Sequence, residues 1–384
     1  MRPDAPRSMR TVLATPLVAF FGVAIACLAC GPGPGGEQEA LNDAGVGLSF
    51  VVPEWSGTWH KGNTHTHTTE SDGDSSPEYV ARWYKDHGYD WLVLSDHNVF
   101  TDPATLAHLV DETFLLIPGE EVTSSFEDAS VHVNGLNLPG LVEARSGETL
   151  VATIQANVDA IREVEGVPHI NHPNFRWSFG VDELRQVRGD RLLEIFNGHP
   201  TVHNEGGGGT PGLVEVWDML LTEGKEIYGI AVDDAHHFQG EFEPDRSNPG
   251  RGWVSVRAET LEPSALMDAL EAGHFYASTG VALEGIDVAP ERITVRIAAD
   301  RDFRYTTTFI GAGGRRLHRT TENPAVFELS SHGSGPGAVS GGAAQDDGAK
   351  AVHYVRAEVQ NSRGDVAWIQ PVFLKPGRLD PPPG

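Results

Sequence analysis

Short apolar runs typical of buried strands alternate, from residue 58 to residue 280, with segments whose apolar residues recur at helical spacing. Strands alternating with helices predict an α/β domain with a parallel sheet, and about seven such units predict a closed β/α barrel. The expected strands are 58–64, 91–94, 114–117, 131–138, 166–170, 192–196 and 227–232. The expected helices are 76–88, 103–112, 149–165, 181–187, 213–223 and 263–272.

The pattern changes near residue 285, where helical periodicity stops and short alternating runs are separated by turn residues. Such runs predict a small β-sandwich of about 90 residues. A Ser/Gly-rich stretch at 330–348 is expected to be a mobile loop within it. The expected strands here are 293–297, 306–310, 326–329, 354–359 and 367–374.

The first 30 residues have the pattern of an export signal, with a basic start and an apolar stretch too short to span a membrane comfortably. Leu28-Ala29-Cys30 is similar to a bacterial lipoprotein cleavage box, in which Cys30 would carry the lipid and Cys27 is the poorer second choice. An ordinary cleaved secretory signal is the alternative. We therefore expect an exported protein, either secreted or anchored at a membrane or cell envelope. The expected segments are signal peptide 1–30, flexible tether 31–52, barrel 53–284, β-sandwich 285–376 and tail 377–384.

Composition narrows the possible partners and metal ligands. A net charge of −26 argues against nucleic acid or an anionic lipid surface as the main partner. The only two cysteines, Cys27 and Cys30, lie in the N-terminal apolar run. Any metal site of the mature domain must therefore use histidine, aspartate and glutamate.

Polar residues gather at the ends of the expected strands, where barrels of this kind place their chemistry. His65 and His67 lie two positions apart in the stretch NTHTHTTESDG, and side chains two apart in an extended segment point to the same side. Among 17 histidines roughly one such pair arises by chance, so a surface turn is the simple alternative. Five later segments repeat the pattern of an apolar run followed by His, Asp or Glu, which favours a metal site. His132 is the exception, because it falls at the start of its strand.

Imidazole and carboxylate ligands without thiolate suit zinc, manganese or iron at hydrolytic sites. The candidates exceed the three or four groups that one zinc ion needs, so two or three divalent ions are expected, with Glu121 able to bridge two of them. Such a pocket would be positive inside an acidic protein and would attract an anion such as phosphate. The candidate ligands are His65, His67, Asp72, His97, Glu121, His132, His172, Asp234 and His236.

A resemblance to a known family rests on six segments that occur in order between residues 58 and 280: HTHTTESDG, LVLSDHN, PGEEVT, VHVNGLNL, HINHPN and GIAVDDAH. Together they resemble the polymerase-and-histidinol-phosphatase (PHP) superfamily of metal-dependent hydrolases. The resemblance implies a distorted seven-stranded β/α (TIM-like) barrel. The C-terminal segments Tyr354-Val355-Arg356 and Ala367-Trp368-Ile369 resemble the exported, carbaryl-hydrolase-like branch, in which at least one member cleaves a carbamate ester.

The resemblance also implies how the ligands divide among three metal ions, with Asp72 standing where many members have histidine. Asp234, Glu121 and His172 are the expected catalytic residues. The implied ligand sets are His65, His67, Glu121 and Asp234 for the first ion, Glu121, His132 and His172 for the second, and Asp72, His97 and His236 for the third.

Neighbouring polar residues have other expected roles. Glu121 is favoured over Glu120, and Asp234 over Asp233, which is instead a candidate to orient an imidazole. Arg176 either holds a substrate anion or makes an ordinary surface ion pair. Supporting or core positions rather than ligand positions are expected for His169, His199, His203 and His237.

Three functions compete. The favoured hypothesis is a metal-dependent hydrolase of phosphoesters that uses a metal-bound hydroxide as nucleophile. The second keeps the metals but acts on a carbamate or carboxyl ester. The third is a non-catalytic exported lipoprotein that binds metal or glycans. For the two enzymes the expected partner is a small ester, which is expected to be anionic in the first case. The membrane is expected to be contacted only through a lipid at Cys30.

Overall fold

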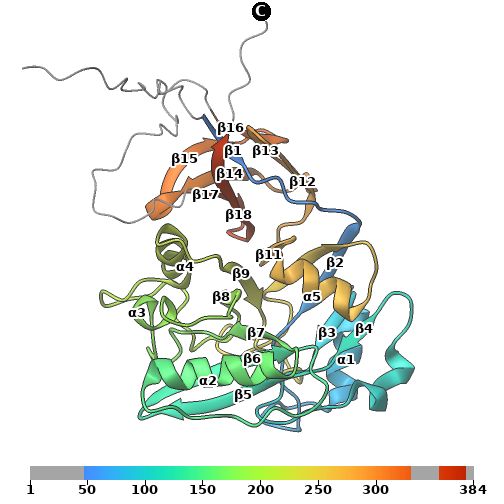
Figure 1. Ribbon diagram of the computed structural model, residues 1–384. Coiled ribbons are helices and arrows are strands. Elements are labelled where there is room, and N and C mark those ends of the chain that lie inside the picture. The colour runs from blue at the N-terminus through green and yellow to red at the C-terminus, as the bar shows by residue number, and fades with distance from the viewer. Residues whose placement is uncertain (1–46, 330–353, 378–384) are drawn as a thin grey trace, which may run out of the picture. The chain divides into compact units, whose positions relative to one another are not determined.

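The computed structural model describes residues 47–329 and 354–377 (Figure 1). The expected signal peptide, most of the tether, the Ser/Gly-rich insert and most of the tail lie outside the described residues. The described residues all belong to one compact unit, Gly45–Gly384. None of the helices in this part of the chain is both long and apolar enough to cross a membrane.

The helices begin and end close to the positions that the sequence signals give them. Helix α1 (Pro77–Asp86) follows Ser76, whose hydroxyl accepts a hydrogen bond from a backbone N–H of the first turn at 3.3 Å, and the chain leaves the helix at Gly88, where φ is +72°. The helix expected at 103–112 is a 3-10 helix, η1 (Pro103–Leu109). The other helices are α2 (Leu150–Glu163), α3 (Val181–Leu184), α4 (Leu213–Thr222), α5 (Pro263–Glu271) and the short 3-10 helix η2 (Ala312–Gly314).

Each apolar run expected as a barrel strand forms a strand. Three additional strands, β5 (Gly119–Phe126), β10 (Trp253–Ala258) and β11 (Phe275–Ser278), are not among the expected ones. β5 has polar residues at most positions, so its sequence does not show the apolar run of a buried strand. The expected strands are β2 (Thr58–Asn63), β3 (Trp91–Val93), β4 (Leu115–Ile117), β6 (Ala129–Leu136), β7 (Val167–Ile170), β8 (Leu192–Asn197) and β9 (Tyr228–Val232).

The predicted parallel pairing is confirmed in two groups, β2–β3–β4 and β7–β8–β9. It is wrong for β6, which pairs antiparallel with β5 and β7, and the unexpected strand β10 also pairs antiparallel with β2 and β11. The reason for β5 and β6 is the connection between them, since only residues 127 and 128 separate the two strands. A connection this short reverses the chain, whereas a parallel pair needs a crossover of a dozen residues or more.

The described strands lie in sheets of ten, five and three strands rather than in one closed seven-stranded sheet. The ten-stranded sheet includes β10, β2, β3 and β4 in this order, and the five-stranded sheet runs from β5 to β9 in chain order. Pro118 alone separates β4 from β5, and proline has no N–H with which to continue a ladder. Isolated parallel bridges join Thr66 to Ala235 and His97 to Glu121, so the two sheets meet at the ends of their strands.

The strands expected after residue 285 are also present, but the sheet crosses the predicted domain boundary. β18 (Val366–Gly377) pairs antiparallel with β11, so the ten-stranded sheet continues past residue 284. The three-stranded sheet β12–β13–β16 shares an apolar cluster with residues of β14, β17 and β18. The strands here are β12 (Leu283–Ala289), β13 (Arg292–Ile297), β14 (Tyr305–Gly311), β15 (Arg315–Thr320), β16 (Ala325–Glu328) and β17 (Tyr354–Asn361), with β1 (Gly47–Phe50) paired to β18.

A buried ion pair connects this C-terminal part to α4. The guanidinium of Arg356, on β17, donates to both carboxylate oxygens of Asp218 at 2.7 Å, and Tyr354 OH donates to the same carboxylate at 2.8 Å. Arg356 is only 2 % exposed and lies over the Trp217 ring. A charge buried this deeply is tolerated because its partners are fixed by geometry.

We predict that Asp218→Asn lowers the free energy of unfolding by about 3 kcal/mol, because it leaves the buried arginine undercompensated. The matched control is Glu163→Gln, which breaks an exposed bidentate pair with Arg145 and should lower the free energy of unfolding much less. Urea unfolding of both variants measures the difference. Equal losses in the two variants would contradict the structural role of the buried pair.

Candidate metal centre

The end of β2 delivers two imidazoles to one pocket. His65 and His67 are fully buried. Their segment is fixed by its backbone, since Asp234 N donates to His65 O at 3.0 Å and His67 N donates to Ala235 O at 2.9 Å. The side chain of Asn63 adds a bond, its Oδ1 accepting from His65 N at 2.9 Å. The two-residue spacing therefore places both rings on the same side of an extended segment, as the sequence predicts.

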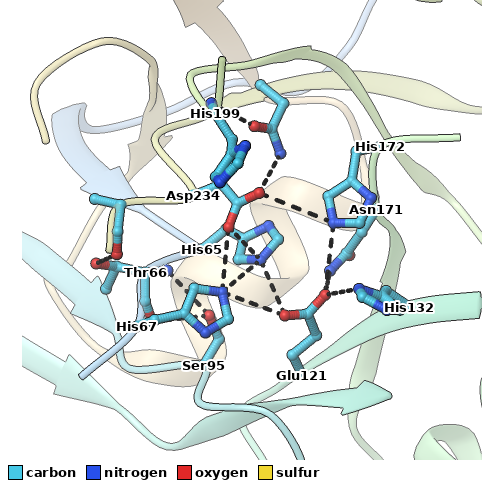
Figure 2. Close-up of polar contacts among 12 residues, drawn as sticks. His65, Thr66, His67, Ser95, Glu121, His132, Asn171, His172, His199 and Asp234 are labelled. Atoms are coloured by element: carbon cyan, nitrogen blue, oxygen red, sulfur yellow. Dashed lines mark hydrogen bonds and ion pairs between the residues drawn. The ribbon is translucent and has the colours of Figure 1, made fainter. Parts of the chain in front are cut away.

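Four donor atoms converge in this pocket: Nε2 of His65, Nε2 of His67, Oε2 of Glu121 and Oδ1 of Asp234 (Figure 2). Five of the distances between pairs of these atoms are 3.1 to 3.3 Å. A small divalent ion with bonds of about 2.0–2.1 Å requires neighbouring donors about 3.3 Å apart. The residues implied for the first ion thus lie together at the spacing of metal ligands.

The two carboxylate oxygens of Glu121 face different imidazoles (Figure 2). Oε2 lies 3.3 Å from Nε2 of both His65 and His67. Oε1 lies 2.7 Å from His132 Nδ1 and 3.6 Å from His172 Nε2. Nδ1 of His132 is buried and, despite this short distance, makes no well-aligned hydrogen bond with the described residues. A carboxylate with one oxygen toward each group of imidazoles can bridge two ions.

The position of His132 at the start of its strand follows from strand direction. β6 is antiparallel to β7, with Val133 paired to Ile170. The start of β6 therefore lies beside the C-terminal end of β7, where His172 follows. A prediction based on parallel strands alone could not place His132 with the other ligands.

The third set of implied ligands lies at the more open end of the cluster. Asp72 Oδ1 is 3.3 Å from His236 Nε2, and Asp72 Oδ2 is 3.7 Å from His97 Nε2. His236 Nδ1 lies 2.9 Å from the backbone oxygen of Asp234, so a proton on Nδ1 leaves Nε2 free as a ligand. The Asp72 side chain is 55 % exposed, whereas the other two sets are mainly buried. His67 also joins this group, since its Nδ1 is 3.6 Å from Asp72.

Glu194 is the functional residue that the candidate list missed. It lies within β8, and its Oε1 accepts a hydrogen bond from His65 Nδ1 at 2.6 Å. Its Oε2 accepts from His172 N at 2.8 Å and from Asn197 Nδ2 at 2.9 Å. Both oxygens are therefore occupied by N–H donors, and Glu194 orients His65 so that Nε2 faces the pocket. A charged residue inside the apolar run LLEIF was the sequence signal, because a buried charge requires a partner.

The sequence has two pairs of adjacent acids, Glu120/Glu121 and Asp233/Asp234. In each pair the member favoured as a ligand faces the pocket. Glu120 lies on the other face of β5, where one oxygen accepts from Val142 N, and burial raises its pKa to about 7. Asp233 accepts from the hydroxyl of Tyr84 and from the backbone N–H groups of residues 250–252. The expectation that Asp233 orients an imidazole is therefore wrong, because its carboxylate fixes a loop instead.

The remaining histidines lie outside the groups of donors that could share an ion among the described residues. His203 stacks on Trp177 with ring centroids 4.2 Å apart. His237 Nδ1 lies 3.2 Å from Ser247 Oγ, and His199 Nδ1 accepts from Thr201 N at 3.3 Å. His169 is fully buried, and its pKa is lowered to about 4 because burial disfavours the charged ring.

Protonation of the pocket is governed by its carboxylates. Burial would raise the pKa of Glu121, but the imidazoles of His132, His65 and His97 hold it well below its usual range. Burial would lower the pKa of His236, but its contact with Asp72 and the charge of Asp234 raise it to about 9. The pKa of His65 is likewise raised, against burial, by Asp234, Glu121 and Glu194. Without metal, several of these imidazoles therefore hold protons at neutral pH.

Comparisons with known proteins give distant structural likenesses only. No protein-family model matches the chain, and no curated protein matches it. Among solved structures, the chain is similar to a two-domain protein from Bacteroides vulgatus ATCC 8482 that contains a predicted PHP-like metal-dependent phosphoesterase, at 16 % identity over 84 % of this chain and 98 % of that chain with a TM-score of 0.47. It is also similar to a candidate metal-dependent phosphoesterase from Bifidobacterium adolescentis ATCC 15703 (14 % identity, 58 % and 97 % covered, TM-score 0.38). A third similar structure is an amidohydrolase from Chromobacterium violaceum with bound sulfate and no metal (14 % identity, 49 % and 93 % covered, TM-score 0.34). TM-scores below 0.5 do not establish a shared fold, so the class of the site rests on its own geometry.

We predict that Glu194→Gln weakens divalent-metal binding by about tenfold or more, because His65 loses the carboxylate that orients its ring. Glu120→Gln is the matched control. Glu120 is also a buried acid, but it faces away from the pocket, so its loss should leave metal affinity unchanged. Calorimetric titration of both variants with zinc or manganese measures the effect. Equal weakening in the two variants would contradict the orienting role of Glu194.

We predict that metal affinity rises with pH up to about 9 and that loading at pH 7.5 releases protons. The imidazolium of His236 is protonated below its pKa of about 9, and only the neutral ring can bind metal. Calorimetry in two buffers of different ionisation heat counts the released protons, and His236→Asn should release fewer. A pH-independent affinity between pH 6.5 and 8.5 would be inconsistent with this protonation.

Proposed function

We propose that the chain is a metal-dependent hydrolase of phosphoesters. The single observation that carries the proposal is the placement of Glu121 between two groups of imidazoles, one facing each carboxylate oxygen. Divalent ions such as zinc, manganese or iron, bound by these groups, would polarise an ester oxygen and lower the pKa of a water molecule. The buried Nδ1 of His132, which lacks a well-aligned hydrogen bond among the described residues, and the 3.1–3.3 Å donor spacing support a fit to such ions.

The side chains of the chain would hold the ions and orient the substrate. Asp234 has its Oδ1 with His65 and His67, while its Oδ2 accepts from Asn197 Nδ2 at 3.1 Å and lies 3.9 Å from His172 Nε2. This carboxylate therefore spans the two buried groups, as Glu121 does. We propose Asp234, Glu121 and His172 as the catalytic residues, because they line the space that both groups share. Two or three ions would bring about +4 to +6, against −4 from Asp72, Glu121, Glu194 and Asp234, and the positive balance with three ions favours an anionic substrate.

A carbamate or carboxyl ester is the second candidate substrate. The observation that favours it is that the carboxylates of Glu121 and Asp234 contact imidazoles and asparagine amides, and neither forms an ion pair with an arginine or lysine among the described residues. With no cationic side chain at the reacting centre, selection of a phosphate would depend on the ions alone. A neutral ester would then also be accepted.

The barrel is part of the proposal. We propose that β2, β3, the broken strand β4/β5, β6, β7, β8 and β9 form a distorted seven-stranded barrel. The bridge between Thr66 and Ala235 supports closure between β9 and β2. The continuity of β4 and β5 across Pro118 supports the connection between the two sheets. We further propose the strands after residue 285 as a β-sandwich that shares β18 with this body. An experimental structure with β9 separated from β2 would contradict the closed barrel.

We predict that the purified protein contains two or three divalent ions by elemental analysis and releases nitrophenol from 4-nitrophenyl phosphate or its diester. His65→Ala and Asp234→Ala should each lower kcat/KM by about 100-fold or more, because each removes a ligand of the first group. His108→Ala, at an exposed histidine away from the donor groups, is the control and should keep full activity.

Substrate choice separates the alternatives in the same assay. Turnover of 4-nitrophenyl acetate or an aryl carbamate, without turnover of any phosphoester, would select the second candidate. Failure to hydrolyse any ester by the fully loaded protein would overturn the enzyme assignment and favour a binding lipoprotein.

A further inference from the structure

A tight double turn follows β7 and carries the side chains of Phe175, Arg176 and Trp177. Its backbone is closed by Phe175 N donating to His172 O at 2.9 Å and Trp177 N donating to Asn174 O at 3.2 Å. Arg176 and Trp177 both have left-handed backbones, with φ of 53° and 57°. A left-handed conformation is sterically unfavourable for a residue other than glycine, asparagine or aspartate. Strain of this kind tends to persist at functional sites, where the surrounding structure holds it in place.

The neighbouring loop holds this turn rigidly. The side-chain amide of Asn174 donates to the backbone oxygens of His203 and Pro211, both at 3.0 Å. Trp177 stacks on the His203 ring at an interplanar angle of 7°. The position of Arg176 between these two anchors is therefore fixed by contacts on both sides.

Arg176 presents an uncommitted positive charge. Its side chain is exposed, and its guanidinium lies over the Phe175 ring, 5.3 Å from the centroid. The Phe175 ring is in turn 5.3 Å from the ring of His172 and 6.1 Å from that of His132. Between residues 47 and 280, all of them described, Arg176 is the arginine whose guanidinium has neither a hydrogen bond nor an ion pair. The other arginines of this range are bound to carboxylates or carbonyl oxygens.

This arrangement differs from that of Arg251, the other arginine near the pocket. The guanidinium of Arg251 donates to the backbone oxygens of Gly198 and Glu243, so it holds these two loop segments together. An ordinary surface ion pair, the alternative expected for Arg176, is absent among the described residues. In a chain with a net charge of −26, a guanidinium without an ion pair among the described residues, on a strained turn that contacts His172 through Phe175, is available to bind an anion.

We propose that Arg176 is a specificity-determining residue that binds a second anionic group of the substrate. The proposal rests on the proposed hydrolase function. The ring of Phe175 lies 5.3 Å both from the guanidinium and from the ring of His172, so we place the second anionic group about one ring away from the reacting ester. The substrate class is a phosphoester whose leaving group carries a carboxylate or a further phosphate. A guanidinium suits either anion because its N–H groups match two oxygens at once.

The experiment compares ligands that differ only in the second charge. Calorimetry of the metal-loaded protein measures the affinity of phenylphosphonate and of 4-carboxyphenylphosphonate. Arg176→Asn removes the charge with little backbone strain, because asparagine tolerates a left-handed conformation, and Arg176→Lys keeps the charge. Arg185→Asn, at an exposed arginine paired with Glu223, is the control. Thermal unfolding of each variant checks that the fold is intact.

We expect the wild-type protein and the control to prefer the carboxylated ligand by about tenfold or more, the size of effect given by a charge-assisted hydrogen bond. Arg176→Asn should reduce the preference to about one, and Arg176→Lys should keep part of it. No preference in the wild-type protein, an undiminished preference in Arg176→Asn, or equal weakening of both ligands would overturn the proposal. Because binding is measured without turnover, a charge preference in a protein that hydrolyses no ester would refute the proposed function while leaving the role of Arg176 intact.

Discussion

A buried carboxylate surrounded by imidazoles is the constraint on which the pocket depends. Glu121 is fully buried, and an isolated carboxylate in such a place would be strongly destabilising. Positive charge must therefore be close to it in every state of the protein. Protons on neighbouring imidazoles can supply that charge, and so can divalent ions. The two are alternatives at the same nitrogen atoms, so the ionisation of the pocket and its metal loading are one coupled equilibrium.

The pocket is held by a second set of buried acids that face backbone or ring N–H groups rather than a metal. Asp96 accepts from Thr68 N at 2.7 Å and from its hydroxyl at 2.8 Å, which fixes the segment after His67. Asp233 fixes the loop at residues 250–252, and Glu194 fixes the ring of His65. These acids fix segments that lie far apart in the sequence and so help to bring the donors of those segments together.

Charge is distributed unevenly between the pocket and its rim. Glu121 and Asp234 pair with imidazoles and with no arginine or lysine among the described residues, so recognition at the reacting centre would depend on bound ions. The rim, in contrast, carries Arg176 on a strained turn beside Phe175. This division separates the chemistry, which would be common to many esters, from selectivity, which a single loop residue can alter. Such a plan lets one donor set serve different substrates.

The sequence by itself determined the residue types, most of the strands and helices, and the nine candidate ligands, because apolar periodicity and the polar residues at strand ends are local features. It could not determine strand direction. The two-residue connection between β5 and β6 reverses the chain there, and only this reversal places His132 beside His172. Nor could it assign Glu194 and Asp233 their partners, since each accepts hydrogen bonds from segments distant in the chain. The tertiary structure decided these contacts because they depend on which strand ends share one edge, a property of the whole sheet arrangement and not of any single segment.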